Sequence, residues 1–169
     1  VSIWTASFKT LLAEYISAVD APLDTCRAIN DSLRRVLPDG AYFTVLYARL
    51  ERGAKRLTLV YAGHPPAILV SGRNGEGHLL EQDGDLLGIF ADAAFGVMTV
   101  PVQAGDRLYL YTDGLIEMHG SREDGCERAL AACRPAAALP LQDAVMAVVD
   151  TICGGLEPQD DIILLGVDV

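Results

Sequence analysis

Three aspartates stand where an apolar stretch of the chain ends or begins, in two segments far apart in the sequence. The first segment reads Tyr-Leu-Tyr-Thr-Asp-Gly-Leu-Ile-Glu over residues 109–117 and carries Asp113 directly before a glycine. The second begins with Asp160 and Asp161 and continues as four apolar residues. Carboxylates at strand ends can share a hard divalent cation, because such ions prefer oxygen ligands. Asp113, Asp160 and Asp161 are therefore candidate metal ligands.

The elements that must position these aspartates are two strands. Leucine and tyrosine alternate over residues 108–111, which predicts a strand that ends at the turn-forming pair Asp113-Gly114. Residues 162–165 are all apolar, which predicts a buried strand with the acid pair at its mouth.

Carboxylates buried at the ends of strands are costly unless a positive charge compensates them. No Lys or Arg lies within four residues of Asp160 or Asp161, and Arg107 is the only cation on the strand of Asp113. A divalent cation would provide the compensation. Each segment alone also fits a plain turn or a solvated strand start, because short motifs often occur by chance.

The composition fits one globular domain of 169 residues, 51% of them hydrophobic. There are 13 Lys and Arg against 23 Asp and Glu, and the net charge of −10 opposes contact with a phosphate backbone, so we expect no nucleic acid partner. The three histidines lack the spacing of zinc ligands. No apolar stretch approaches the ~20 residues that a membrane span needs, so we expect a soluble, cytoplasmic domain without membrane insertion.

The cysteines form no C-x-x-C pair, and each lies in alanine-rich or apolar surroundings. In such places cysteine usually acts as a small hydrophobe, so all four are expected to be reduced and structural. They are Cys26, Cys126, Cys133 and Cys153.

Hydrophobic periodicity predicts helices at both ends of a run of strands. Apolar residues at helical spacing indicate helices over residues 2–19, 23–37, 126–134 and 141–152. Besides the strand that ends at Asp113, alternating or short apolar runs indicate strands over residues 42–50, 56–62, 67–70, 78–80, 95–100 and 162–169. This order predicts an α+β domain in which antiparallel sheets are covered by helix pairs.

Five short motifs follow one another along nearly the whole chain. They are Ala-Gly-His-Pro-Pro over 62–66, Leu-Leu-Gly-Ile over 86–89, Ala-Gly-Asp over 104–106, Tyr-Thr-Asp-Gly over 111–114 with Glu117, and Asp-Asp-Ile over 160–162. Together they resemble the SpoIIE/RsbU branch of the metal-dependent (PPM, type 2C) serine/threonine phosphatases. The resemblance implies an α-β-β-α sandwich and two Mn²⁺ or Mg²⁺ ions. It also implies hydrolysis of phosphoserine or phosphothreonine, commonly on an anti-sigma-factor antagonist.

The resemblance also assigns roles to single residues. Asp113 matches the metal-binding aspartate of the Thr-Asp-Gly motif, and Asp160 matches the first, metal-binding aspartate of the Asp-Asp motif. Asp161 is expected to be an outer-shell partner of the metal. His64 is expected to be a turn histidine bonded to backbone, and Glu117 a local structural contact, rather than catalysts.

The family has two further glycine-aspartate motifs on N-terminal strands, and neither is found in this sequence. The chain begins near the family's first helix, so residues 1–169 are expected to form a single but N-terminally partial domain with weak metal binding and little activity. Missing strands would leave unpaired sheet edges, which favours a homodimer. A smaller difference is Ile163, where the family often has threonine.

Three functions remain open at this point. The parent protein is an active phosphatase in a signalling pathway, with a sensor or receiver domain upstream, or it is a non-catalytic pseudophosphatase that binds a partner. The third reading is an acidic structural domain whose aspartate pairs are plain turns. Retention of Asp113 and Asp160 argues against complete decay of the site. In this family the first two helices are implicated in metal-dependent switching. Residues 8–37 could therefore be part of the hydrophobic core, part of a regulatory switch, or both.

Overall fold

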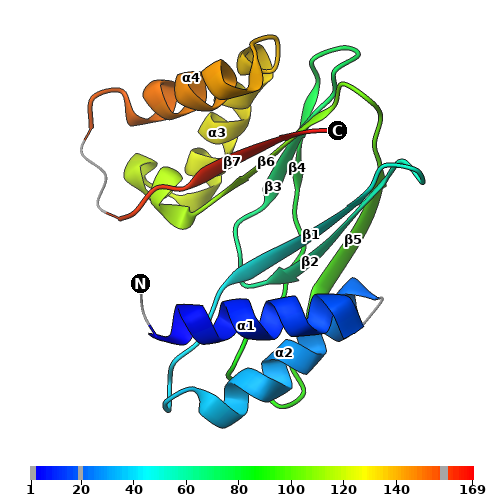
Figure 1. The fold of residues 1–169 in the computed structure, drawn as a ribbon. Helices are drawn as coiled ribbons and strands as arrows, with labels where there is room; N and C mark the ends of the chain where they lie inside the picture. The colour runs from blue at the N-terminus through cyan, green and yellow to red at the C-terminus, as the bar shows by residue number, and fades with distance from the viewer. Residues whose placement is uncertain (1–2, 19–20, 157–159) are drawn as a thin grey trace. The chain divides into compact units, whose positions relative to one another are not determined.

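The computed structural model describes residues 3–18, 21–156 and 160–169, which form two compact units (Figure 1). The first unit contains the chain up to Glu51 together with residues 56–64 and 82–100. The second contains residues 52–55, 65–81 and 101–169. In the described ranges, no helix is both long and apolar enough to cross a lipid bilayer.

The first unit packs two helices on a sheet. The helices are α1 (Ile3–Ala18) and α2 (Pro22–Val36), and the sheet has the order β1 (Val45–Glu51), β2 (Arg56–Ala62), β5 (Gly96–Pro101). Strands β1 and β2 are antiparallel. Helix α2 begins at a proline, whose fixed φ suits the first turn, and ends with Arg34 and Arg35, which complement the helix dipole.

Among the described residues of the first unit, α2 contributes more fully buried side chains than α1. Ile29 and Leu33 of α2 are buried completely or nearly so. The described side chains of α1 in this cluster are only partly buried, and Phe8 stacks on Phe43 with ring centroids 5.3 Å apart. The predicted helix pair over residues 2–19 and 23–37 is confirmed: α1 contacts α2, and α2 contacts β1 and β2.

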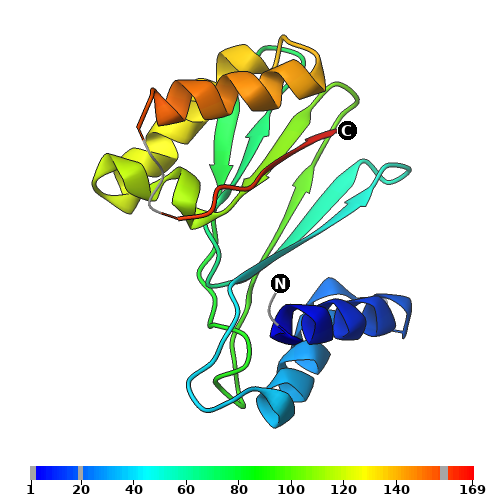
Figure 2. The same ribbon diagram turned by 60° about the vertical axis from the view of Figure 1, so that its left-hand side comes forward.

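The second unit has a sheet of the order β4 (Gly77–Leu80), β3 (Ala67–Val70), β6 (Arg107–Tyr111), β7 (Leu164–Asp168). Each of these neighbouring pairs is antiparallel. Helices α3 (Arg122–Ala136) and α4 (Leu141–Cys153) pack together and cover one face of this sheet (Figure 2). Tyr109, Leu115 and Val148 are fully buried between them.

Helix α3 begins four residues earlier than the predicted helix over 126–134. Ser121 precedes its first turn, and the Ser121 hydroxyl accepts a hydrogen bond from the backbone N–H of Asp124 at 3.1 Å. This N-cap satisfies a backbone donor that has no partner within the helix. The helix therefore starts at the cap, although its alanine-rich part begins later.

The predicted α+β class is confirmed, and the strands over 56–62 and 67–70 have the predicted bounds. Two 3₁₀ helices after β6 were not predicted: η1 (Asp113–Leu115) and η2 (Glu117–His119). The prediction of a buried strand over 162–165 is wrong, because Ile163 is 63% and Leu165 51% exposed. In the described residues β7 pairs with β6 alone, at the edge of the sheet, so its side chains alternate between covered and open positions.

The four cysteines are free thiols, as predicted. Three are buried, and Cys153 is partly exposed. Burial raises the pKa of Cys26 and of Cys133 to about 12, because the thiolate is poorly solvated there. These thiols are neutral packing groups at ordinary pH.

Candidate metal centre

Asp113 lies at a sharp turn directly after β6. The backbone N–H of Leu115 donates to the carbonyl oxygen of Thr112 at 3.1 Å. The backbone N–H of Ile116 donates to the backbone carbonyl oxygen of Asp113 at 2.8 Å. The side chains of Leu115 and Ile116 are buried in the core of the second unit and hold the turn against it. The Asp113 side chain is left exposed at the end of the strand.

Thr112 connects this turn to the segment that carries the paired aspartates. Its backbone N–H donates to the carbonyl oxygen of Ile163 at 3.0 Å, and its hydroxyl accepts from the N–H of Ile163 at 2.9 Å. The same hydroxyl donates to the carbonyl oxygen of Asp161 at 3.0 Å. One threonine therefore fixes the end of β6 beside the residues that precede β7.

Gly114 brings the two segments into direct contact. A Cβ atom at this buried position would lie 2.7 Å from the carbonyl oxygen of Asp161 and 3.1 Å from that of Asp160. Only glycine lets the backbones approach so closely. The sequence prediction that the Asp-Gly and Asp-Asp segments meet is thus matched by their backbones, and all three aspartate side chains are exposed there.

The three carboxylates are the type of ligand that a hard cation prefers, but they are too few to complete its coordination sphere. In the described part of the chain, no Lys or Arg forms an ion pair with Asp113, Asp160 or Asp161. Yet no group of three or more His, Cys, Asp or Glu in that part is arranged to hold a metal ion. Since Mg²⁺ takes six oxygen ligands, these aspartates provide only part of a coordination sphere.

Arg107, the cation on the strand of Asp113, pairs elsewhere. Its Nε donates to the carboxylate of Asp168 at 2.5 Å, and its Nη1 donates to the carbonyl oxygen of Leu139 at 3.0 Å. This hydrogen bond with Asp168 raises the pKa of the guanidinium. Arg107 is buried and ties β6 and β7 to the connection between α3 and α4, so it offers no compensation to Asp113.

The family resemblance also singles out His64 and Glu117. His64 follows β2 in the first unit and is partly buried, whereas Asp113 belongs to the second. Glu117 is exposed at the start of η2, and within the described ranges its side chain makes no hydrogen bond or ion pair. The predicted local contact of Glu117 is therefore not found among these residues.

Sequence reasoning did not assign the positioning roles of Thr112 and Gly114. Both belong to the Thr-Asp-Gly motif, so the signal was present in the residues that flank Asp113. What the motif alone does not state is the partner of each flanking residue, which depends on the pairing of β6 with β7.

The profile of the family described as stage II sporulation protein E (SpoIIE) matches residues 2–169. This chain belongs to the SpoIIE family. The resemblance predicted from the five motifs is confirmed, and the match extends over both compact units.

Two proteins similar to this chain are named as phosphoserine phosphatases. The chain is 36% identical over 117 residues to the phosphoserine phosphatase RsbP of Bacillus subtilis, covering 67% of this chain and 29% of that protein. It is 25% identical over 96 residues to the phosphoserine phosphatase RsbU of the same organism, covering 57% of this chain and 29% of that protein. The chain thus spans less than a third of these curated relatives.

Solved structures share the fold. The structure of the RsbU and RsbW domains of a Mycobacterium tuberculosis protein matches with a TM-score of 0.83 and 25% identity, over 95% of this chain and 45% of that one. The PP2C domain of SiaA from Pseudomonas aeruginosa matches with a TM-score of 0.80 and 22% identity, over 99% of this chain and 71% of that one. The fold is therefore that of the PP2C-type phosphatases.

Proposed function

We propose that residues 1–169 form the catalytic domain, or the larger part of it, of a metal-dependent phosphatase that hydrolyses phosphoserine or phosphothreonine on a signalling protein. The observation that carries this proposal is the packing of the Asp113-Gly114 turn against Asp160 and Asp161, with all three carboxylates exposed. Its support from outside the chain is membership of the SpoIIE family and relatives named as phosphoserine phosphatases.

Asp113 and Asp160 are the proposed ligands of Mn²⁺ or Mg²⁺, and Asp161 is a proposed outer-shell partner. A bound ion of this kind supplies hydroxide from water and stabilises charge on the phosphoryl group. The chain's own contribution is to hold the carboxylates: Thr112 and Gly114 keep the two segments together through the contacts given above. Because the described residues provide only part of a ligand set, the remaining ligands are proposed to come from groups outside the described residues.

The substrate class and partners follow from the relatives as proposals. A phosphorylated anti-sigma-factor antagonist is the proposed substrate, because the resemblance to the SpoIIE/RsbU branch implies it. The similar structure from Mycobacterium tuberculosis contains an RsbU domain together with an RsbW domain. An upstream sensor or receiver domain, a homodimer and a cytoplasmic location belong to the same proposal. Sensory control would fit a chain that spans only 29% of its relative RsbP.

The test is phosphatase activity of the full-length parent protein with Mn²⁺, on p-nitrophenyl phosphate and on a phosphoserine peptide. Asp113→Ala and Asp160→Ala are each expected to lower turnover about a hundredfold or more, because a metal centre contributes several kcal/mol of charge stabilisation. Asp150→Ala, an exposed aspartate on α4, is the matched control and should leave turnover unchanged. Unchanged turnover in both ligand variants would contradict the assignment.

A pseudophosphatase is the second candidate, favoured by one observation: in the described residues no group of three potential ligands surrounds a metal position. This function predicts that the full-length protein with Mn²⁺ has no turnover on either substrate. It also predicts that the protein still binds a phosphorylated partner protein. Turnover that depends on Asp113 would exclude it.

A further inference from the structure

Strand β7 forms an edge of the second unit's sheet, and one of its sides is open. In the described residues it pairs with β6 alone. Two large hydrophobic side chains at alternating positions, Ile163 and Leu165, are 63% and 51% exposed. Edge strands of soluble proteins are usually protected by Lys, Pro or a bulge. Residues 162–167 contain no charged residue and no proline, so this edge lacks the usual protection against pairing with another chain.

The backbone groups on the open side of β7 belong to alternate residues. The carbonyl oxygen of Ile163 accepts from the N–H of Thr112 at 3.0 Å, so the backbone of Ile163 points toward β6. In an antiparallel strand the N–H and C=O of one residue point to the same side, and the side alternates along the strand. Leu164 and Gly166 therefore direct their N–H and C=O groups to the open side, where these groups can form a ladder with a further strand.

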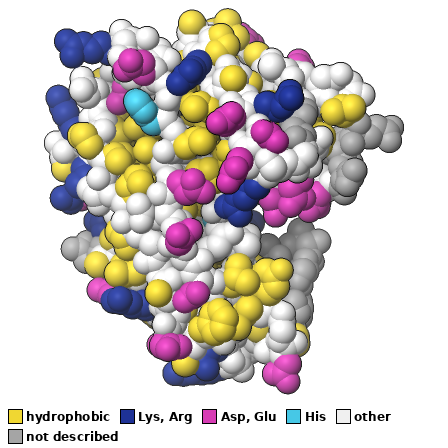
Figure 3. All heavy atoms as spheres, turned by 180° about the vertical axis from the view of Figure 1, so that it is seen from behind, with side chains coloured by type: hydrophobic (Ala, Val, Ile, Leu, Met, Phe, Trp, Pro, Cys, Tyr) yellow, Lys and Arg dark blue, Asp and Glu magenta, His cyan; other side chains and the backbone are white. Residues whose placement is uncertain are grey.

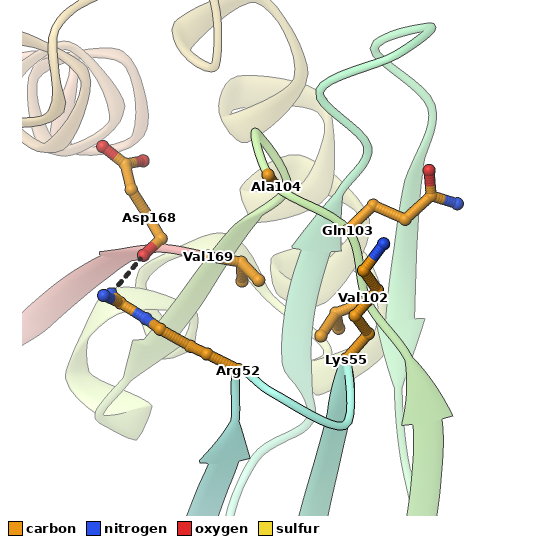
Figure 4. A pocket seen from close by; sticks show the side chains of 7 residues that line it. All are labelled: Arg52, Lys55, Val102, Gln103, Ala104, Asp168 and Val169. Atoms are coloured by element: carbon orange, nitrogen blue, oxygen red, sulfur yellow. Dashed lines mark hydrogen bonds between the residues drawn. The ribbon is translucent and has the colours of Figure 1, made fainter.

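Arg52 reaches the end of the same open side. It donates through Nη2 to the carbonyl oxygen of Asp168 at 3.2 Å, and Figure 4 shows its guanidinium turned toward the end of β7. Among the described residues, Arg52 forms no ion pair with a carboxylate, and Asp160 and Asp161 form none with a cation. The open side of β7 thus carries an unpaired cation at its end and unpaired carboxylates at its start.

We propose that two copies of this chain associate through β7, antiparallel and edge to edge, about a two-fold axis at Leu165. A two-fold contact requires a surface that complements itself. Antiparallel pairing brings the end of each β7 beside the start of the other. Arg52 of one copy therefore comes beside Asp161 of its partner, and the same contact occurs a second time across the axis.

This register also covers the exposed side chains of the strand. Leu165 lies opposite the partner's Leu165, and Ile163 lies opposite the partner's Val167. Both are non-hydrogen-bonded pairs, in which the Cα atoms are only about 4.5 Å apart and the side chains touch. Apolar cross-strand pairs of this kind stabilise a sheet. Leu164 lies opposite the partner's Gly166, and these two residues exchange the hydrogen bonds of the new ladder.

Charge limits which surfaces of this chain can associate. A net charge of −10, with acidic side chains spread over the face in Figure 3, opposes contact between two copies through most surfaces. The β7 edge instead places one cation of each copy beside a carboxylate of the other. The partner's Arg52 stands beside Asp161 of the candidate metal centre, so each copy contributes a residue to the surroundings of the other's carboxylates.

Sedimentation velocity of residues 1–169 over a range of concentrations tests the proposal without metal and without phosphatase activity. A monomer–dimer equilibrium is expected. Leu165→Lys places two like charges at the axis and should weaken the dimer about tenfold or more. Because Leu165 is half exposed, the far-UV circular dichroism of this variant should stay that of the wild type. Met146→Lys, at a 57% exposed position on α4, is the matched control and should leave the dimer unchanged.

An exchange of charges tests the register. Arg52→Asp and Asp161→Arg should each weaken the dimer, because each places like charges beside one another across the interface. The double variant restores opposite charges and should regain most of the lost affinity. Arg73→Asp, at an exposed cation in another turn, should leave the dimer unchanged.

Amide hydrogen exchange reports on the edge itself. The N–H groups of Leu164 and Gly166 should be protected in the dimer and exchange fast in Leu165→Lys. A monomer at every concentration, a dimer that Leu165→Lys does not weaken, or a double charge variant that is not restored would overturn the proposal. Protection of the same two N–H groups in a monomer would also overturn it, because another segment would then cover β7.

Discussion

The two compact units share a plan, a sheet with a helix pair packed on it, but differ in how completely the helices are buried. In the second unit both helices bury several side chains, and the turn after β6 is anchored by Leu115 and Ile116. In the first unit, none of the described side chains of α1 is fully buried, although α2 buries five. The candidate ligands therefore stand on the unit whose described helix side chains are more completely buried, and among the described side chains those of α1 are the least buried.

This difference in burial suggests which helix would move if the first two helices act as a metal-dependent switch. Regions with few buried apolar contacts open at lower free energy than the core of a domain. Among the described residues, helix α1 contacts its cluster through partly buried side chains: Phe8, Leu11, Leu12 and Tyr15. A hydrogen bond of 2.9 Å between the hydroxyls of Tyr15 and Ser32 adds one polar link to α2. If the first helices move during regulation, α1 is expected to move more readily than α3 or α4.

The largest expected effect compares one leucine from each unit. Leu115→Ala removes a fully buried side chain and should lower the free energy of unfolding by about 2 to 5 kcal/mol. Leu12→Ala, at a partly buried position of α1, should cost about 1 kcal/mol because less apolar surface returns to water. Urea unfolding of both variants measures the two values. Equal losses of unfolding free energy in the two variants would contradict the difference in burial between the units.

Arg107 provides the next test, because among the described residues the buried charged side chains, Asp106 and Arg107, both belong to the second unit. Arg107→Met keeps most of the side-chain volume but loses the bonds to Asp168 and to the carbonyl oxygen of Leu139. We expect a loss of about 2 to 3 kcal/mol, as for hydrogen bonds to charged groups. Asp168→Asn keeps an acceptor and should cost less. Wild-type stability in Arg107→Met would show that packing alone holds this part of the sheet together.

Gly114→Ala tests the contact between the two aspartate segments. The new Cβ would clash with the backbone oxygens of Asp160 and Asp161, so stability should fall by about 1 to 3 kcal/mol. Affinity for Mn²⁺ in the full-length protein should fall as well, since the segments must separate. Gly53→Ala is the control: a Cβ there meets nothing within 4 Å, and a change within about 0.5 kcal/mol is expected. Unchanged stability in Gly114→Ala would contradict the close packing.

The smallest effect concerns pH and one buried thiol in each unit. Cys26 on α2 and Cys133 on α3 have a pKa of about 12 when folded, above the ordinary value of 9.0. Between these values the folded state retains protons that the unfolded state loses, so stability is full below pH 9 and falls as pH rises toward 12. Each thiol contributes a slope of up to about 1.4 kcal/mol per pH unit.

Thermal unfolding between neutral and alkaline pH measures this loss. Cys133→Ala and Cys26→Ala should each flatten the alkaline part of the profile, and the double variant should flatten it further. A profile that is the same in both single variants and the wild type would mean that other groups cause the loss.

Much of this fold could be predicted from local pattern. Alternation placed β2 and a short apolar run placed β3 at their observed bounds, because each lies between clear turn residues. The exposure of Ile163 could not be read from the sequence, since four consecutive apolar residues look alike whether a strand is central or at an edge. The start of α3 could have been predicted, because Ser121 followed by Asp124 is an N-terminal capping signal.

In the candidate metal centre, too, some features could be predicted from local sequence and others could not. The motifs predicted which aspartates would approach one another, and the register of β6 with β7 brings their segments together. The partner of Arg107 is set by that register, 61 residues further along the chain, and no local pattern encodes it. The left-handed Lys55 was also missed, since nothing in Arg-Gly-Ala-Lys over residues 52–55 marks lysine as the residue with positive φ.

The central claim is that Asp113 and Asp160 bind one metal centre, and Mn²⁺ titration by calorimetry tests it most directly. The full-length protein is compared with its Asp113→Asn, Asp160→Asn and Asp150→Asn variants, which each remove one carboxylate charge. The account predicts saturable binding in the wild type and in Asp150→Asn, and affinity at least about tenfold weaker in each of the other two. Wild-type affinity in both Asp113→Asn and Asp160→Asn would contradict it.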